Sequence, residues 1–218
     1  MGWRKALEIG GVLAAIVLFA FGIAAIVIGL DGRSTVKDEL TAQMITGTPD
    51  MTPTNITAAV KEAGLDPAKI PIPSCSVAGQ LVDTGGEARC FAQYMNVHAL
   101  ESTGGLVYSQ MPRYASPDGK GTNDPKAAVQ VNGKPQDNAA RNIWVTETAL
   151  ATALNASYMA DQTALFGVVV GIALLIAGLG FAILAIGGAL RNPESIFNRK
   201  KKEAPAEAAA TGGAAPTT

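Results

Sequence analysis

The residues with the most chemical potential in this sequence surround its single histidine, His98. Tyr94, His98 and Glu101 follow at steps of four and three residues, which places them on one face of a helix predicted over about 87–102. Histidine and glutamate can form an acid–base pair, and with Cys90 they supply ligands that a transition metal accepts. A metal site, however, needs three or four ligands at recognisable spacing. We therefore interpret His98 as a packed or surface histidine hydrogen-bonded to a neighbour, and retain Tyr94, His98 and Glu101 as a candidate ligand site.

The two cysteines of the chain, Cys75 and Cys90, lie fifteen positions apart. They could form a disulfide, remain unrelated thiols or supply half of a metal site. The charge pattern described below places them outside the cytoplasm, where disulfides form and persist. Closing a loop of this length contributes about 3 kcal/mol on the chain-entropy estimate. We predict this disulfide, and we expect no metal site and no cofactor.

Motifs of known enzyme chemistry are missing from the sequence. It contains no nucleophile elbow, phosphate-binding loop, zinc-protease helix or dinucleotide fingerprint. Residues 118–124 carry oxygen side chains, but they lack the alternation and terminal glutamate of a calcium loop, so we interpret them as a mobile or partner-contacting loop. We expect no catalytic residues, and an enzyme built on His98 and Glu101 is the least favoured interpretation.

Two long apolar runs, Ile9–Leu30 and Ala164–Leu190, must position everything else, and neither contains a charged residue. About 20 apolar residues span a bilayer core as a helix, so the pattern predicts two transmembrane helices over 9–30 and 164–190. The first run is longer than the apolar region of a cleavable signal peptide and lacks a clear cleavage site, which favours an uncleaved signal anchor. Neither run contains the ionisable groups that a transporter or proton relay needs.

The flanking charges predict the orientation of these helices. Arg4 and Lys5 precede the first run, and Arg191 and the cluster Arg199–Lys202 follow the second. Residues 31–163 contain ten lysines and arginines against fourteen aspartates and glutamates. Since cytoplasmic flanks carry the lysine and arginine excess, we expect a two-span plasma-membrane protein with both termini cytoplasmic. The Ala- and Gly-rich composition indicates a bacterial chain.

The sequence thus predicts a mainly α membrane protein with helical extracytoplasmic extensions and a small, loop-rich, disulfide-stapled ectodomain. Its segments are a cytoplasmic N-terminus over 1–8, the first span over 9–30, an extracytoplasmic domain over 31–163, the second span over 164–190, and a cytoplasmic basic segment and disordered tail over 191–218. Within the domain we expect an extension over 34–46, a short helix over 53–63 capped by Thr52, a Gly-rich loop between the cysteines, and one helix running from 138 to 190.

Small residues at four-residue spacing in both runs predict close helix packing in lipid, either between the two spans or against a neighbouring protein. These residues are Gly11, Ala15, Ala25, Gly29, Gly167 and Gly171.

The function that best fits these features is a non-catalytic structural or accessory subunit of a larger membrane complex. It would pack through its spans against membrane lipid and partner membrane proteins or a second copy, and contact partners with its ectodomain. The net acidic ectodomain disfavours nucleic acid as a partner. The alternative is an extracytoplasmic ligand-binding or sensing module, with a pocket lined by Tyr94, His98, Tyr108, Arg113 and Tyr114.

Overall fold

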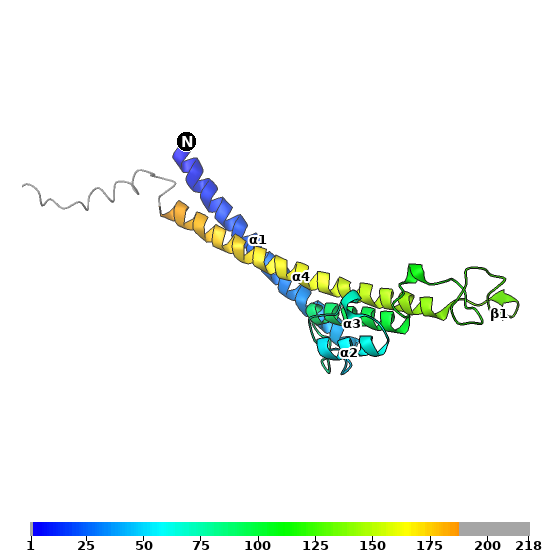
Figure 1. The fold of residues 1–218 in the computed structure, drawn as a ribbon. Helices are drawn as coiled ribbons and strands as arrows, with labels where there is room; N and C mark the ends of the chain where they lie inside the picture. Colours follow the sequence, from blue (N-terminus) through cyan, green and yellow to red (C-terminus); the bar gives the residue numbers. More distant parts are fainter. Residues whose placement is uncertain (1, 188–218) are drawn as a thin grey trace, which may run out of the picture. The chain divides into compact units, whose positions relative to one another are not determined.

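The computed structural model describes residues 2–187, and the predicted segment 191–218 and the end of the second apolar run lie outside the described residues. The chain is mostly helical (Figure 1). Its elements are α1 (Trp3–Ala42), α2 (Pro53–Glu62), the 3-10 turns η1 (Pro67–Lys69) and η2 (Tyr108–Gln110), α3 (Gly85–Ser102), the short strands β1 (Gln130–Val131) and β2 (Lys134–Pro135), and α4 (Ala139–Ile186). Residue contacts divide it into two units, Met1–Ile28 with Gly167–Thr218 and Gly29–Phe166, each described by itself.

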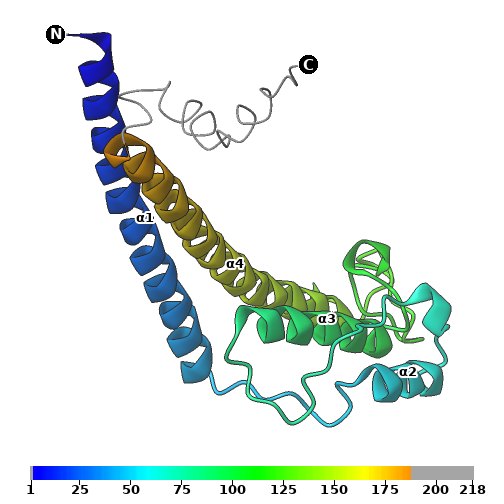
Figure 2. The same cartoon turned by 90° about the vertical axis from the view of Figure 1, so that its left-hand side faces the viewer.

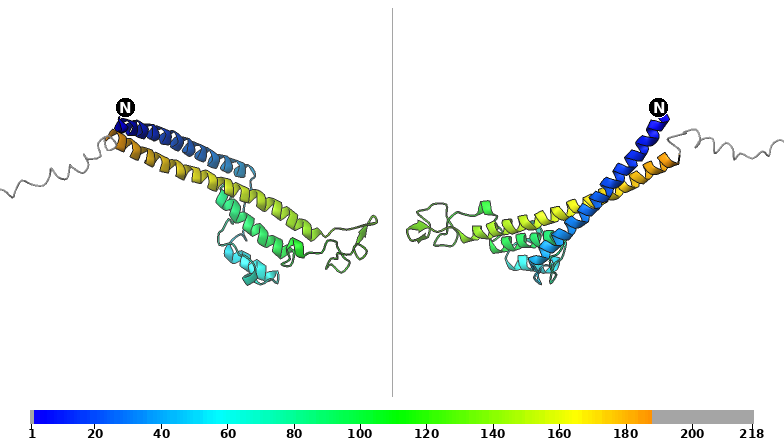
Figure 3. Two further views of the ribbon diagram at one scale, coloured as in Figure 1. Left: turned by 90° about the horizontal axis from the view of Figure 1, so that it is seen from above. Right: turned by 180° about the vertical axis from the view of Figure 1, so that it is seen from behind.

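In the first unit the apolar parts of α1 and α4 pack side by side and antiparallel (Figure 3). Glycines allow the close approach: a Cβ on Gly171 would lie 2.7 Å from the Gly22 carbonyl oxygen, and a Cβ on Gly178 would lie 3.3 Å from the Ala15 carbonyl oxygen. Both helices are long and apolar enough to cross a membrane. In the most apolar stretch of each helix only 17% of the residues are buried, whereas the core helix of a globular fold is mostly buried.

The second unit is built on three helices, with α3 lying between α2 and α4 (Figure 2). α3 crosses α4 closely at its first residue, because Gly85 leaves room: a Cβ there would lie 2.7 Å from the Asp161 Cβ. One buried cluster fills the space between the helices and the preceding loops. Its members are Leu40, Met51, Ile56, Val60, Val77, Val82, Ala88, Cys90, Phe91, Ala92, Tyr94, Val97 and Leu154.

Local capping explains the two short helices. The Thr52 hydroxyl accepts the Asn55 amide at 3.1 Å and Pro53 occupies the first turn of α2, as the sequence predicts. α3 begins with a capping box in which the Thr84 hydroxyl accepts the Glu87 amide and the Glu87 carboxylate accepts the Thr84 amide. This box starts the helix at Gly85, so Gly85 and Gly86 belong to the helix and not to the Gly-rich loop expected between the cysteines.

The disulfide between Cys75 and Cys90 is confirmed, with its two Cα atoms 6.1 Å apart. It joins the loop before α3 to the first turns of that helix. The same loop pairs with the segment after α1 through bridges at Thr46–Leu81 and Gly47–Ala78. Gly47 is required there, because a Cβ would lie 1.9 Å from the Val77 carbonyl oxygen.

The predicted end of the extension after the first span was wrong. α1 ends at Ala42 rather than continuing to 46. Met44 has a φ of +52° and is 79% exposed, so the helix does not continue through it. The chain must turn here to bring Ile45 and Gly47 against the segment 78–82, and this tertiary pairing overrides the helical pattern.

The polar stretch before α4 folds as a tied loop. Asn132 and Gly133 have φ values of +52° and +72° and connect β1 to β2, and an Asn-Gly pair favours this kind of two-residue hairpin turn. Tyr114 bridges both Thr122 and Asp137, which closes the loop on itself. α4 then runs without interruption to Ile186, as the sequence predicts within the described residues.

Candidate functional site

The single histidine lies between two carboxylates. His98 Nδ1 is 2.9 Å from Glu101 Oε2, one helical turn further along α3, and its Nε2 is 3.3 Å from Asp50 Oδ2 in the loop before α2. A neutral imidazole can donate to only one of these carboxylates, whereas the protonated ring donates to both. Glu101 Oε1 is buried without a hydrogen-bond partner among the described residues. The geometry ties α3 to the Asp50 loop.

Tyr94 does not join this arrangement, although sequence spacing put it on the same face. Its side chain is fully buried in the core, and its hydroxyl donates to the Cys75 carbonyl oxygen at 2.6 Å. Burial raises the pKa of this phenol above its ordinary value. The structure therefore brings together His98 and Glu101 of the candidate ligand site and assigns Tyr94 to the support of the disulfide loop.

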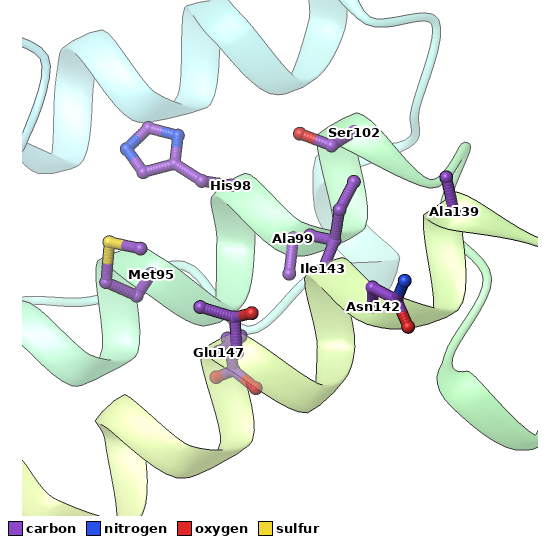
Figure 4. A pocket seen from close by; sticks show the side chains of 9 residues that line it. Met95, His98, Ala99, Ser102, Ala139, Asn142, Ile143 and Glu147 are labelled. Carbon is purple, nitrogen blue, oxygen red and sulfur yellow. The ribbon is translucent and has the colours of Figure 1, made fainter.

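A groove of about 420 Å³ separates the C-terminal half of α3 from the start of α4 (Figure 4). His98 stands at one side of this groove, and the buried Glu147 at the other accepts hydrogen bonds from the Asn96 amide and the Thr148 hydroxyl, both at 3.3 Å. Most of the wall is apolar. The lining residues are Met95, His98, Ala99, Ser102, Ala139, Asn142, Ile143, Thr146 and Glu147.

A second, more polar pocket of about 230 Å³ lies at the N-terminus of α4. The Arg141 guanidinium carbon is 4.1 Å from the centre of the Tyr108 ring, and Arg113 contributes a second cation. The lining residues are Tyr108, Arg113, Asp137, Asn138, Arg141, Asn142 and Val145. Sequence reasoning had named Tyr108 and Arg113 as ligand-pocket residues but missed Arg141, whose signal is its position in the first turn after the cap Asn138.

Trp144 positions Tyr108 in this pocket. Its indole N–H donates to the Leu106 carbonyl oxygen at 2.8 Å and also lies 3.3 Å from the Thr103 hydroxyl. These bonds hold the chain after α3 against α4, and a small buried cluster of Ala99, Leu100, Met111 and Trp144 packs around them. Tyr114, also expected in a ligand pocket, lies under the Arg113 guanidinium at 5.1 Å and does not line the cavity.

The residues predicted to pack the spans differ in burial. Gly11, Ala15, Gly29 and Gly171 are buried, while Ala25 and Gly167 are half-buried. Sequence reasoning missed Gly22 and Gly178, which make the closest backbone approaches together with Gly171. A seven-residue spacing could have identified them, because Ala15 and Gly22, like Gly171 and Gly178, are seven residues apart. Residues at this spacing lie on the same contact face of two packed helices.

Within residues 2–187, no group of three or more histidine, cysteine, aspartate or glutamate side chains is arranged to hold a metal ion. Comparison of the whole chain with protein-family models, curated proteins and solved structures finds no significant match.

Proposed function

We propose that this protein is a two-span plasma-membrane protein that serves as a non-catalytic structural or accessory subunit of a membrane complex. The observation that carries the proposal is the outward face of the paired helices. After α1 and α4 have packed together, large apolar side chains such as Phe21, Ile28, Ile176 and Ile183 still point outward and are exposed. An apolar surface of this extent requires lipid or a partner helix to cover it.

Charge and cysteine chemistry support the orientation. Residues 31–163 carry a net charge of −4, and Arg4 and Lys5 precede the first span, so the flanks follow the positive-inside pattern. The Cys75–Cys90 disulfide fits an oxidising compartment outside the cytoplasm. In this orientation the domain over 31–163 is extracytoplasmic and both termini are cytoplasmic.

Topology is tested by cysteine labelling. Lys120→Cys lies on the exposed loop before α4 and should react with a membrane-impermeant maleimide on intact cells. A Ser195→Cys variant in the predicted cytoplasmic segment should react only after the cells are lysed. Labelling of Ser195→Cys but not Lys120→Cys on intact cells would reverse the proposed orientation.

The accessory role is tested by site-specific photo-crosslinking in the native membrane. A photoreactive amino acid at the exposed Ile176 should yield one discrete adduct with a second membrane protein or a second copy of the chain. The matched control is the same amino acid at the buried Ala185, which should crosslink only within the chain. Adducts with lipid alone at Ile176 contradict packing of this face against a partner.

A ligand-binding or sensing module is the second candidate, because the groove between α3 and α4 combines apolar walls with His98 and Glu147. Such a module would purify from mild detergent as a lone particle whose unfolding temperature rises with a bound small molecule. A stoichiometric protein partner favours the accessory subunit instead.

A further inference from the structure

We propose that the pocket at the N-terminus of α4 binds an oxyanion, the carboxylate or phosphate of a small hydroxylated molecule, through Arg113 and Arg141. This inference does not depend on whether the spans have a protein partner. It rests on the charges, the packing and the backbone geometry of residues 108–145.

Both arginines lack an anionic partner. Three other lysine and arginine side chains, Arg33, Lys37 and Lys69, form ion pairs with carboxylates within 4.0 Å, but among residues 2–187 neither Arg113 nor Arg141 does so. The Nε of Arg141 is also shielded from solvent and has no hydrogen-bond partner in the described part of the chain. A buried donor without an acceptor is costly, and an oxygen of a bound anion would satisfy it.

Packing fixes Arg141 in place before any ligand arrives. Its guanidinium carbon lies 4.1 Å from the centre of the Tyr108 ring, and this stacking limits the rotation of the side chain. Tyr108 is in turn held by the Trp144–Leu106 hydrogen bond. A pre-ordered guanidinium loses less conformational entropy when it binds.

The backbone holds Arg113 beside the start of α4. The Asn138 amide donates to the Arg113 carbonyl oxygen at 2.9 Å, and the Asn138 side-chain amide donates to the Pro112 carbonyl oxygen at 3.0 Å. Asn138 also accepts the Ala140 amide through its side-chain oxygen, which caps the helix. The positive end of the α4 dipole therefore lies beside the two arginines and adds to their attraction for an anion.

Asp137 also lines this pocket, and its carboxylate does not lie within 4.0 Å of the Arg113 or Arg141 side-chain nitrogens. This carboxylate is therefore available to accept a hydrogen bond from the ligand. An acceptor beside two cations suits a ligand that carries a hydroxyl group next to its oxyanion. A cavity of about 230 Å³ accommodates a molecule of the size of glycerol 3-phosphate or glycerate. The same phosphoglycerol chemistry occurs in an anionic lipid headgroup and in a free metabolite.

The test is calorimetric titration of the full chain in neutral detergent at constant ionic strength. Glycerol 3-phosphate and glycerate are the probes, and glycerol is the uncharged control. We expect saturable binding at one site for at least one probe and none for glycerol. Arg141→Gln and Arg113→Gln should each weaken binding by about tenfold or more, because each removes a charge-assisted hydrogen bond. Lys126→Gln, which removes the same charge from an exposed position of the segment before α4, should leave the affinity unchanged.

Arg113 is exposed, so Arg113→Gln keeps the proposal testable if Arg141→Gln unfolds. The absence of saturable binding by both probes overturns the proposal, and so does binding that neither arginine substitution weakens. Repeating the titration in phosphatidylglycerol and phosphatidylcholine nanodiscs separates the two sources of ligand. If the probe binds more weakly in phosphatidylglycerol nanodiscs than in phosphatidylcholine nanodiscs, the lipid headgroup competes for the pocket. If the probe binds with equal affinity in both, the ligand is a free molecule.

Discussion

Arg33 and Asp161 form an ion pair between α1 and α4, in which the arginine Nε donates to the aspartate Oδ1 at 3.0 Å. Asp161 is 8% exposed and lies against the first residue of α3, so one carboxylate lies where three helices of the domain meet. The positive N-terminal end of α3 stabilises the same charge. The pair joins α1 to α4 within the unit Gly29–Phe166.

Asp161→Asn should lower the free energy of unfolding by about 1–2 kcal/mol, because it removes the charge that pairs with Arg33 and α3 while keeping the side-chain shape. The expected loss is modest since the Arg33 side chain is 45% exposed and partly screened by solvent. Thermal unfolding in mild detergent measures the effect. The matched control is Asp38→Asn, an exposed position on α1, which should leave the unfolding temperature unchanged.

Removing the disulfide should destabilise the domain over 29–166. The Cys75→Ser, Cys90→Ser double variant should lose about 3 kcal/mol, because the bond closes a 15-residue separation and restricts the unfolded chain. Denaturant unfolding checks the magnitude, and wild-type protein treated with reductant should match the variant. In the untreated native protein neither cysteine should be alkylated; uptake of the reagent before reduction contradicts the bond.

Tyr94 should make stability fall at alkaline pH. Burial raises its folded-state pKa above that of the unfolded chain, so its contribution is fully present below about pH 10 and is lost as the pH rises through the folded-state pKa. Tyr94→Phe should cost about 1 kcal/mol at neutral pH, since it removes the hydrogen bond to Cys75. The difference between variant and wild type should narrow above pH 10.

The alkaline effect is specific to the buried phenol. Tyr114→Phe, at a half-buried position, is the matched control and should retain the pH dependence of the wild type. Unfolding curves recorded at intervals from neutral to strongly alkaline pH make the comparison. A Tyr94→Phe variant whose stability declines as steeply as that of the wild type would contradict the assignment.

The glycines in the apolar part of α4 should differ sharply in how well they tolerate substitution by alanine. A Cβ at Gly171 would lie 2.6 Å from the Ile26 side chain and 2.7 Å from the Gly22 carbonyl oxygen, whereas a Cβ at Gly180 meets nothing within 4 Å. Gly171→Ala should therefore lower the unfolding temperature, because the helices must separate. Gly180→Ala should leave it unchanged or raise it, since alanine favours helix by about 1 kcal/mol. Equal effects at the two positions would exclude this packing.

Local signals in the sequence were sufficient for some elements. Thr52, Pro53 and Gly64 delimit α2 through chemistry that acts within a few residues, and the Asn132-Gly133 pair does the same for the hairpin. The uninterrupted α4 also follows from local pattern, because no breaking residue occurs between Asn138 and Ile186. The disulfide was predictable because the chain offers only one pair of cysteines.

Features that depend on distant pairing could not be predicted. Met44 carries a helical pattern, but the pairing of the next residues with the loop 78–82 turns the chain there. Arg141 reaches Tyr108 only because Trp144 anchors the segment after α3, and no spacing in the sequence encodes that route. Gly22 does not stand out at four-residue spacing, because the contacting small residues, Ala15 and Gly22 on α1 and Gly171 and Gly178 on α4, repeat at seven.

Nearly all residues of the buried cluster in the domain come early in the chain, which affects the order in which the domain can fold during synthesis. Twelve of its thirteen residues lie between Leu40 and Val97, together with both partners of the disulfide, and the remaining one is Leu154 on α4. A growing chain therefore contains nearly the whole core before α4 has been made. Disulfide closure and packing around Tyr94 can precede the second apolar run, and the arrival of Leu154 completes the core.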